Sequence, residues 1–544
     1  MRRRLPAIAM AAALLAAACG PAAPASPSAP GQSPAPSPNG GGDVLRVARL
    51  ADHYNFWHPV QFQTGNQFQW WSAVFNTLVE AEADSRTVVG DLAESWEVSP
   101  DATVFTFKLV ENATWHDGEP FDADDVMFTI TWATQNYDSF LGFAPLWNQI
   151  KGADAVKGTT NVPEGLRKVD DFTVEVTLAA PNAEALYALT DMANVILPEH
   201  VLKDVTAADV EKVPFTLGTP GVTVGTGPYK LAAFTPDQSV ELEAYADYFK
   251  GAPKISKIIF KLFADPALAV AQLESGDLDL AFRVSPGEFD RLSAIDTLNV
   301  ISADNPGIIR IVFRTGIDPW SDKRVRQAVY YAINRQAIVD DFYKGRARVL
   351  INPPGFQEYD DLNRYEYNVD TAKQLLADAG YNGQPFRILY NQTFPDAQQV
   401  MPLIQSDLQA AGITTELVPT DNEGFLAQYN SGEGHEAFIA VGGSEGLSPD
   451  RSRQYFNPTD PKIESGYTNP RIFELWAEGR ATADPAARDA AYHELARILN
   501  EDVPQANLYS PNLVMVATKR LGGGFDIHLN ERETFMDVET WTLE

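Results

Sequence analysis

Histidine and aspartate stand side by side in the motif Trp115-His116-Asp117-Gly118. Such a pair could act as a general base with its orienting carboxylate. On a strand, however, adjacent side chains point to opposite faces, so these two would not face each other. Asp117-Gly118 is also a turn signal. We therefore expect a turn here, no catalytic residues and no enzyme.

Metal chemistry has little support in the sequence. The seven histidines are scattered, and none occurs in a His-Glu-x-x-His pattern. The single cysteine, Cys19, cannot form the cysteine clusters that hold structural zinc. We expect no metal site and no cofactor.

The N-terminus has the pattern of an export signal. Three arginines at positions 2–4 precede the apolar run Leu5–Ala18, which is shorter than the roughly 20 residues that span a bilayer. Three alanines lead directly to Cys19, and this arrangement resembles a bacterial lipobox, in which the cysteine is acylated. An ordinary secretory signal with an incidental cysteine is the alternative. We expect a lipoprotein signal peptide at residues 1–18 and lipidation of Cys19.

Residues 19–43 consist almost entirely of Pro, Ala, Ser and Gly. Such a composition cannot bury enough apolar surface to fold. Its prolines favour an extended polyproline conformation, which suits a semi-rigid spacer. We interpret this segment as a disordered tether between a lipid anchor and the folded body.

Composition limits the rest of the chain. With 544 residues it should contain more than one domain, and its hydrophobic content of 45% is ordinary for a globular protein. A net charge of −31 argues against nucleic acid as a partner, because binding to phosphates requires basic patches.

Periodicity predicts mixed α and β elements in the body. Alternating apolar residues predict strands at Val104–Leu109 and Val169–Leu178, and helical spacing predicts an amphipathic helix over Lys323–Tyr343. Arg324 and Arg326 on that helix are expected to lie on a solvated or ion-paired face. Further helices are predicted at Asp124–Thr134, with Asp122 and Asp125 as a capping pair, at Val369–Ala379, closed by Gly380, and at Ala486–Asn500.

Several sequence blocks then carry a resemblance. They are Asp91-Leu-Ala-Glu-Ser-Trp-Glu-Val-Ser99, Trp115-His-Asp-Gly-Glu-Pro-Phe121, Gly225-Thr-Gly-Pro-Tyr-Lys-Leu231, Asp247-Tyr-Phe-Lys-Gly-Ala-Pro-Lys254, Leu273-Glu-Ser-Gly-Asp-Leu-Asp279 and Asp322-Lys-Arg-Val-Arg-Gln-Ala328. In this order they are similar to family 5 of the bacterial extracellular solute-binding proteins, which comprises dipeptide-, oligopeptide- and nickel-binding components of ABC importers.

The resemblance implies an α/β, two-lobed, periplasmic-binding-protein-like fold of type II, in the large peptide-binding subclass, with an extra domain inserted in lobe I. Aligning the blocks assigns residues 44–76, 222–307 and 518–544 to lobe I, residues 77–221 to the inserted domain and residues 308–517 to lobe II. The Gly225-Thr226-Gly227-Pro228 stretch lacks the spacing of a phosphate loop and is interpreted as a close crossing between lobes.

The resemblance also implies a ligand site. Peptide-binding relatives pair the peptide ammonium group with an aspartate four residues before a loop proline, and the matching residue before Pro449 is Glu445, which is one methylene longer and still anionic. A solvated loop glutamate is the alternative. Gln63, Thr64 and Gly65 match a segment whose backbone pairs with extended ligands. Gly442 and Ile439 replace a tryptophan and a carboxylate-binding arginine that relatives often carry.

Aromatic residues gather near that backbone segment, and Trp70 and Trp71 are among them. They are either core residues or a sugar-binding platform, since ligand clefts are often lined with aromatic rings. Arg314 stands where relatives usually have asparagine, and its guanidinium either clamps a ligand carboxylate or pairs with a neighbouring acid.

The resemblance therefore implies a monomeric substrate-binding lipoprotein of an ABC importer. It would be anchored to the cell membrane through Cys19 on the extracytoplasmic side, and it would deliver peptides or another polar solute to permease and ATPase subunits. An oligosaccharide-binding member of the same family, or a surface lipoprotein with a sensing role, are the alternatives.

Overall fold

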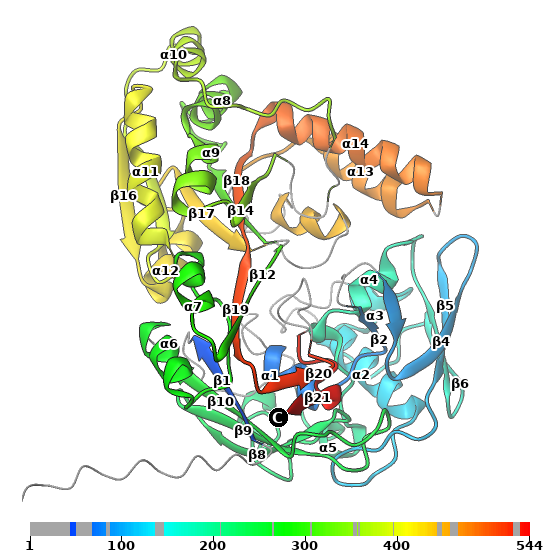
Figure 1. The fold of residues 1–544 in the computed structure, drawn as a ribbon. Coiled ribbons are helices and arrows are strands. Elements are labelled where there is room, and N and C mark those ends of the chain that lie inside the picture. The colour runs from blue at the N-terminus through cyan, green and yellow to red at the C-terminus, as the bar shows by residue number, and fades with distance from the viewer. Residues whose placement is uncertain are drawn as a thin grey trace, which may run out of the picture. The chain divides into compact units, whose positions relative to one another are not determined.

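The computed structural model describes residues 44–50, 68–82, 87–136, 146–206, 208–263, 266–304, 307–351, 356, 359–394, 396–442, 449–456, 466–482, 484–525 and 534–544. These residues belong to one compact unit, which spans residues 43–544. Figure 1 shows three main sheets with helices around them.

The largest sheet has seven strands, and it collects segments from both ends of the chain. Its order is β12 (Leu298–Ala303), β19 (Leu513–Thr518), β11 (Leu280–Ala281), β1 (Val44–Leu50), β10 (Lys257–Phe263), β9 (Ser239–Ala244) and β8 (Tyr229–Thr235). Strand β1 runs parallel to β10 and β11, and the other pairs are antiparallel.

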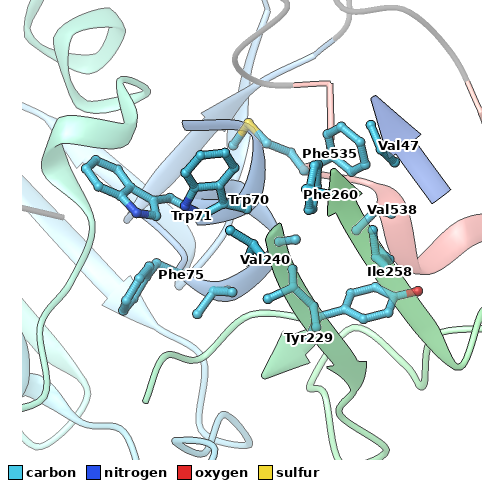
Figure 2. Packing of buried hydrophobic residues seen from close by; sticks show 14 of the residues in the cluster. Val47, Trp70, Trp71, Phe75, Tyr229, Val240, Ile258, Phe260, Phe535 and Val538 are labelled. Carbon is cyan, nitrogen blue, oxygen red and sulfur yellow. The ribbon is translucent and has the colours of Figure 1, made fainter. Parts of the chain in front are cut away.

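A hydrophobic cluster joins this sheet to helix α1 (Phe68–Val74) and to the C-terminal segment. The ring of Trp70 meets Phe260 edge-on at 5.9 Å between centroids, and Phe535 packs against the same Phe260 ring at 5.1 Å (Figure 2). Burial of such rings contributes about 1.5–3 kcal/mol for each side chain. Apolar contact therefore holds α1 against the sheet.

The second sheet has six strands in the order β14 (Ala347–Val349), β18 (Gln505–Pro511), β13 (Ile308–Phe313), β17 (Ala437–Gly442), β15 (Phe386–Asn391) and β16 (Thr415–Thr420). Among the helices in the same part of the chain are α8 (Lys323–Ala332), α9 (Arg335–Ala337), α10 (Val369–Asp378), α11 (Ala397–Ala410), α12 (Asn422–Ser431), α13 (Pro470–Arg480) and α14 (Pro485–Asp502).

The third sheet, of four strands, has the order β4 (Ala93–Val98), β5 (Val104–Leu109), β7 (Thr173–Thr177) and β6 (Leu166–Asp170). Two two-stranded antiparallel sheets complete the described strands: β2 (Val79–Ala81) with β3 (Val88–Gly90), and β20 (Leu521–Gly523) with β21 (Trp541–Leu543). The remaining α-helices are α2 (Ala123–Gln135), α3 (Ala153–Val156), α4 (Ala185–Leu189), α5 (Glu199–Leu202), α6 (Pro266–Ser275) and α7 (Phe289–Ser293).

Most predicted elements are present. Strand β5 and helices α10 and α14 are confirmed, and α2 begins at the predicted capping box of Asp122 and Asp125. The strand predicted over Val169–Leu178 is present as β7 but begins later, at Thr173, because Phe172 donates its N–H to the Asp170 side chain at 2.9 Å where the chain turns between β6 and β7.

The single helix predicted over Lys323–Tyr343 is interrupted. Helix α8 ends at Ala332, and Ile333 is extended. Asn334 then caps a new helical turn by accepting the N–H of Ala337 at 3.1 Å. Asparagine favours such caps because its short side chain competes with helical backbone bonds.

The chain passes between the seven- and six-stranded sheets from β12 to β13 and again from β18 to β19, and Figure 1 shows β18 continuing into β19. Strand β19 joins the seven-stranded sheet at Leu513, whereas the sequence alignment placed that change at Thr518. The division of the chain into lobes remains a prediction.

Lys250, whose side chain is 23% exposed, reaches two buried acids and joins the four-stranded part of the chain to the seven-stranded part. The Lys250 ammonium lies 2.8 Å from the Glu80 carboxylate and 2.9 Å from that of Asp91. Asp91 also accepts the Asn76 amide at 2.8 Å and the Thr77 N–H at 2.9 Å. Burial and the nearby Asp91 raise the pKa of Glu80 to about 8, although Lys250 lowers it. We name Lys250, Glu80 and Asp91 the lysine clamp.

Replacement of this lysine should destabilise the fold. In Lys250→Met, the buried Asp91 carboxylate loses its counter-charge and buried Glu80 loses its hydrogen-bond partner, so we expect the free energy of unfolding to fall by about 3–5 kcal/mol. Urea unfolding at pH 7 measures this change. Lys108→Met is the control, because its ion pair with Glu94 is exposed and should be worth less than about 1 kcal/mol. Equal effects of the two variants would contradict the prediction.

Candidate ligand-binding site

The predicted binding residues are divided between described and undescribed parts of the chain. Gln63, Thr64, Gly65 and Glu445 lie outside the described residues, as does the predicted lipidation site Cys19. Trp70, Trp71 and Arg314 are described, so their surroundings can be compared with the expectations.

Trp70 and Trp71 lie in the core. Both side chains have 0% exposure and belong to the cluster that joins α1 to the seven-stranded sheet (Figure 2). A sugar-binding platform requires a ring face open to the ligand. Trp70 and Trp71 are therefore core residues, which is the ordinary role of a tryptophan.

Arg314 forms hydrogen bonds to two backbone carbonyls in the segment between α12 and β17. Its guanidinium donates to the carbonyl of Gly432, at the end of α12, and to that of His435 at 3.5 Å. Burial lowers the pKa of His435, and the charge of Arg314 lowers it further. In this arrangement Arg314 caps the end of helix α12.

Strand β17 leads to the loop that carries Glu445. It ends at Gly442, whose φ of +122° is a conformation that only glycine adopts readily. The guanidinium of Arg310 on β13 donates to the Gly442 carbonyl at 3.1 Å, and Arg310 is only 3% exposed. A buried cation therefore holds the strand end three residues before Glu445.

Arg310 was not singled out in the sequence. Its signal was a lone charge in the apolar strand Ile308–Phe313. Pairing explains its burial, because β13 is flanked on both sides and Arg310 stands opposite Ala440 on β17 and Asn507 on β18. The Asn507 carbonyl accepts the hydroxyl of Tyr330 at 2.6 Å. A pocket adjoins these residues, and it is lined by Tyr330, Ile351, Phe456, Leu499, Asn500, Pro504, Gln505 and Asn507.

Two sequence features near the end of β17 bear on ligand binding and on catalysis. Ile439 is buried in the core cluster of the six-stranded sheet, so it leaves no polar group where relatives often carry an arginine. Residues 442–446 have the spacing Gly-x-Ser-x-Gly of a nucleophile elbow, and Ser444 lies outside the described residues.

The His116 motif has a structural role: the histidine ring binds the backbone of Gly225 and Gly227. The ring Nδ1 accepts the Gly225 N–H at 3.1 Å, so the proton is on Nε2, which lies 2.9 Å from the Gly227 carbonyl. Burial lowers the pKa of His116 to about 4 and keeps the ring neutral. Asp117 instead contacts His200 at 2.9 Å, which confirms that His116 and Asp117 do not form a pair.

The glycines beside His116 allow a close backbone approach. A Cβ on Gly225 would lie 1.9 Å from the Val74 carbonyl oxygen, and the Gly227 N–H donates to that oxygen at 2.9 Å. The segment therefore passes directly over the end of α1, and a crossing between lobes at these glycines stays a prediction.

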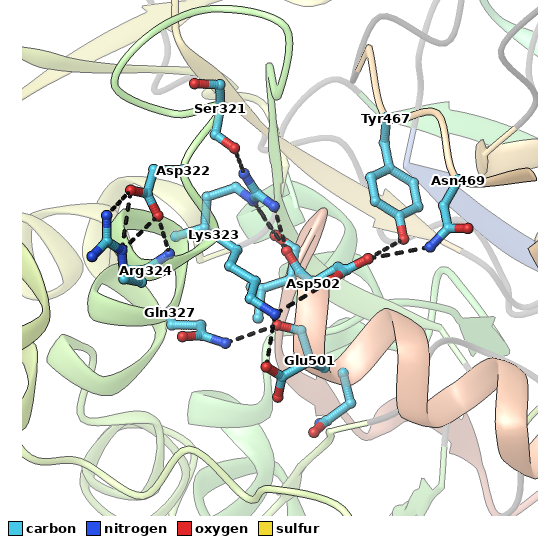
Figure 3. Close-up of polar contacts among 12 residues, drawn as sticks. Ser321, Asp322, Lys323, Arg324, Gln327, Tyr467, Asn469, Glu501 and Asp502 are labelled. Carbon is cyan, nitrogen blue, oxygen red and sulfur yellow. Dashed lines mark hydrogen bonds and ion pairs between the residues drawn. The ribbon is translucent and has the colours of Figure 1, made fainter. Parts of the chain in front are cut away.

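The two arginines of helix α8 have different roles. Arg324 pairs with Asp322 at 2.6 Å, as expected for an ion-paired face (Figure 3). The same expectation is wrong for Arg326, which is 4% exposed and donates to the carbonyls of Val503 at 2.9 Å and Trp320 at 2.6 Å. It caps the end of α14, whose last carbonyls have no helical partner.

The described ranges bear on two further classes of function, membrane insertion and metal binding. Within them, no helix combines the length and apolar character needed to cross a membrane. The same residues contain no group of three or more histidine, cysteine or acidic side chains that could hold a metal ion.

Comparison with known proteins agrees with the sequence blocks. The profile of the bacterial extracellular solute-binding proteins, family 5 middle, matches residues 87–462. A Brucella ovis protein named as a peptide-binding protein of an ABC transporter is 31% identical over 474 residues, which cover 84% of this chain and 85% of that protein. The dipeptide-binding protein of Escherichia coli K12 is 26% identical over 473 residues, covering 82% and 85% of the two chains.

Solved structures show the same fold. The oligopeptide-binding protein AppA from Bacillus subtilis, determined in complex with a nonapeptide, superimposes with a TM-score of 0.78 over 92% of this chain and 99% of its own, at 23% identity. The fold is therefore the α/β fold of the periplasmic binding proteins. The chain belongs to family 5 of the bacterial extracellular solute-binding proteins.

The buried His116 should make stability depend on pH. Its folded pKa of about 4 lies below its ordinary value of 6.5, so the unfolded chain binds more protons between these values. Stability present above pH 6.5 is therefore lost as the pH falls toward 4, by on the order of 2–3 kcal/mol. Unfolding in urea at pH 7.5 and at pH 5 should show a larger loss for the natural chain than for His116→Gln. Parallel losses in both proteins would contradict this assignment.

Proposed function

We propose that the chain is the peptide-capturing component of an ABC importer, which binds peptides between its lobes and delivers them to a membrane permease. The observation that carries this proposal is the similarity, over 84% of the chain, to a protein named as a peptide-binding protein of an ABC transporter. Arg310 supports it, because this buried cation fixes the end of β17 next to the loop that contains Glu445.

In this proposal Glu445 accepts the ammonium group of the peptide. A charge-assisted hydrogen bond of this type contributes about 1.5–3 kcal/mol. Gln63, Thr64 and Gly65 would pair with the peptide backbone, which makes binding tolerant of sequence. The oligosaccharide alternative has lost support, because Trp70 and Trp71 are core residues.

A panel of di- to pentapeptides tests the proposal by thermal shift on the full chain, with cello- and manno-oligosaccharides alongside. A ligand at one hundred times its dissociation constant adds about 2.7 kcal/mol to the free energy of unfolding. We expect a free peptide to stabilise the chain and its N-acetylated form to do so far less. Stabilisation by a sugar and by none of the peptides would overturn peptide capture.

The role of Glu445 is tested with the same peptide. Glu445→Gln keeps the size of the side chain and removes its charge, so we expect a 10- to 100-fold rise in Kd, which corresponds to the energy of one charge-assisted bond. Glu433→Gln, a substitution of an exposed glutamate before β17, is the matched control and should leave Kd unchanged. If Glu445→Gln binds the free peptide as tightly as the natural chain does, the assignment of Glu445 is wrong.

We further propose that Cys19 carries the lipid anchor and that residues 19–43 form the tether. The support is the sequence pattern around Cys19. Expressed in a bacterium, the natural chain should sediment with membranes, and Cys19→Ala should appear in the fraction that does not sediment. Membrane association that survives Cys19→Ala would contradict lipidation at this residue.

A further inference from the structure

Two polar contacts join the segment before helix α4 to helices α13 and α14. The N–H of Ala183 donates to the carbonyl of Arg480 at 3.0 Å, and the Glu184 carboxylate lies 3.3 Å from the Arg488 guanidinium. Residues 183–184 belong to the predicted inserted domain and residues 480–488 to predicted lobe II, so these contacts connect parts of the chain that the predicted division places in different domains.

The inserted-domain side of the contact is firmly held. Asn182 is buried, and its N–H donates to the Ala102 carbonyl at 2.9 Å. Its side chain donates to Gln149 at 3.1 Å and accepts the Glu184 N–H at 3.0 Å. Ala183 and Glu184 therefore present their groups from a fixed backbone.

The lobe II side is complementary to this segment. Arg480 is the last residue of α13, and its carbonyl is one of the four at a helix end that have no partner within the helix. Its side chain pairs with Asp450 at 3.3 Å. Helices α13 and α14 pack closely here, because Gly479 leaves room for the Tyr492 ring. Burial raises the pKa of Tyr492, and the carboxylates of Asp450 and Glu184 raise it further, which places Tyr492 beside the contact.

These contacts lie away from the two places where the chain connects the large sheets. Those connections are covalent and persist in any arrangement of the lobes, whereas the contacts of Ala183 and Glu184 are reversible. The Glu184 side chain is 9% exposed and that of Arg488 is 27% exposed. Such a pair is screened by salt much less than an exposed one, and loss of either partner leaves a poorly solvated charge.

We propose that Ala183, Glu184, Arg480 and Arg488 form a latch that favours the arrangement in which the inserted domain touches lobe II. A contact made in one arrangement and absent from the other shifts the equilibrium by its own free energy. The latch residues thereby determine affinity for any bound solute without touching it, mainly through the rate at which the solute dissociates.

Distance measurements without any ligand test the latch. Because Cys19 is the single cysteine, a full chain with Cys19→Ser accepts spin labels at two introduced cysteines. Val162→Cys, on the inserted-domain side, and Arg497→Cys, on α14, are at exposed positions. Double electron–electron resonance then gives the distribution of distances between the two spin labels.

Charge reversal should open the latch. In Glu184→Arg we expect the ratio of long to short distances to rise about fivefold or more, the lower range of typical coupling between two states. Adding Arg488→Glu should return the distribution toward that of the parent chain. Arg471→Gln is the matched control, because it breaks ion pairs with Glu478 and Glu494 within the same two helices and should leave the distances unchanged.

The outcomes separate the latch from a folding defect and from the proposed function. If Glu184→Arg fails to unfold cooperatively, Glu184→Gln replaces it and should show a smaller rise in the same ratio. An unchanged distribution in the folded variant, or no restoration by Arg488→Glu, overturns the latch. Since no solute is present, failure to find a bound peptide would overturn peptide capture and leave this result standing.

Discussion

The ion pairing of Lys250 is the constraint on which the arrangement of the N-terminal half depends. One ammonium group contacts Glu80 on β2 and Asp91 before β4, and Asp91 in turn holds the backbone just after α1 through Thr77. A buried charge is tolerated only when its partners are in place. The segments that carry these groups must therefore meet in one geometry, which also brings the glycines at 225 and 227 onto the end of α1.

Local patterns predicted the local structure well. Alternation of apolar residues was sufficient for β5, and a capping box fixed the start of α2. Predictions failed where one side chain redirected the backbone. Asp170 turns the chain after β6, and Asn334 ends the helical run that the apolar spacing of α8 would have continued. Short polar side chains of this kind compete with regular hydrogen bonding, and periodicity does not record that competition.

The surroundings of the candidate site could not be predicted in the same way, because they depend on contacts between distant segments. Arg310 is buried because β17 and β18 flank its strand, and neither pairing is visible in the strand itself. Arg326 looked like a residue on a solvated helix face until the end of α14 was placed beside it. Trp70 and Trp71 were compatible with a core, the default for tryptophan, and with a ligand platform, and packing of the Trp70 ring against β10 within a buried cluster favours the core.

The order of strands in the seven-stranded sheet has a consequence for how the chain is made. Strand β19, near the C-terminus, is inserted between β12 and β11, and β11 pairs in turn with the N-terminal β1. Contacts between such distant segments slow folding, because a long loop must close before they form. During synthesis, which proceeds from the N-terminus, this sheet stays incomplete until residue 518 has emerged. Because its largest sheet is completed late, the chain stays accessible for longer to the cellular proteins that act on unfolded chains.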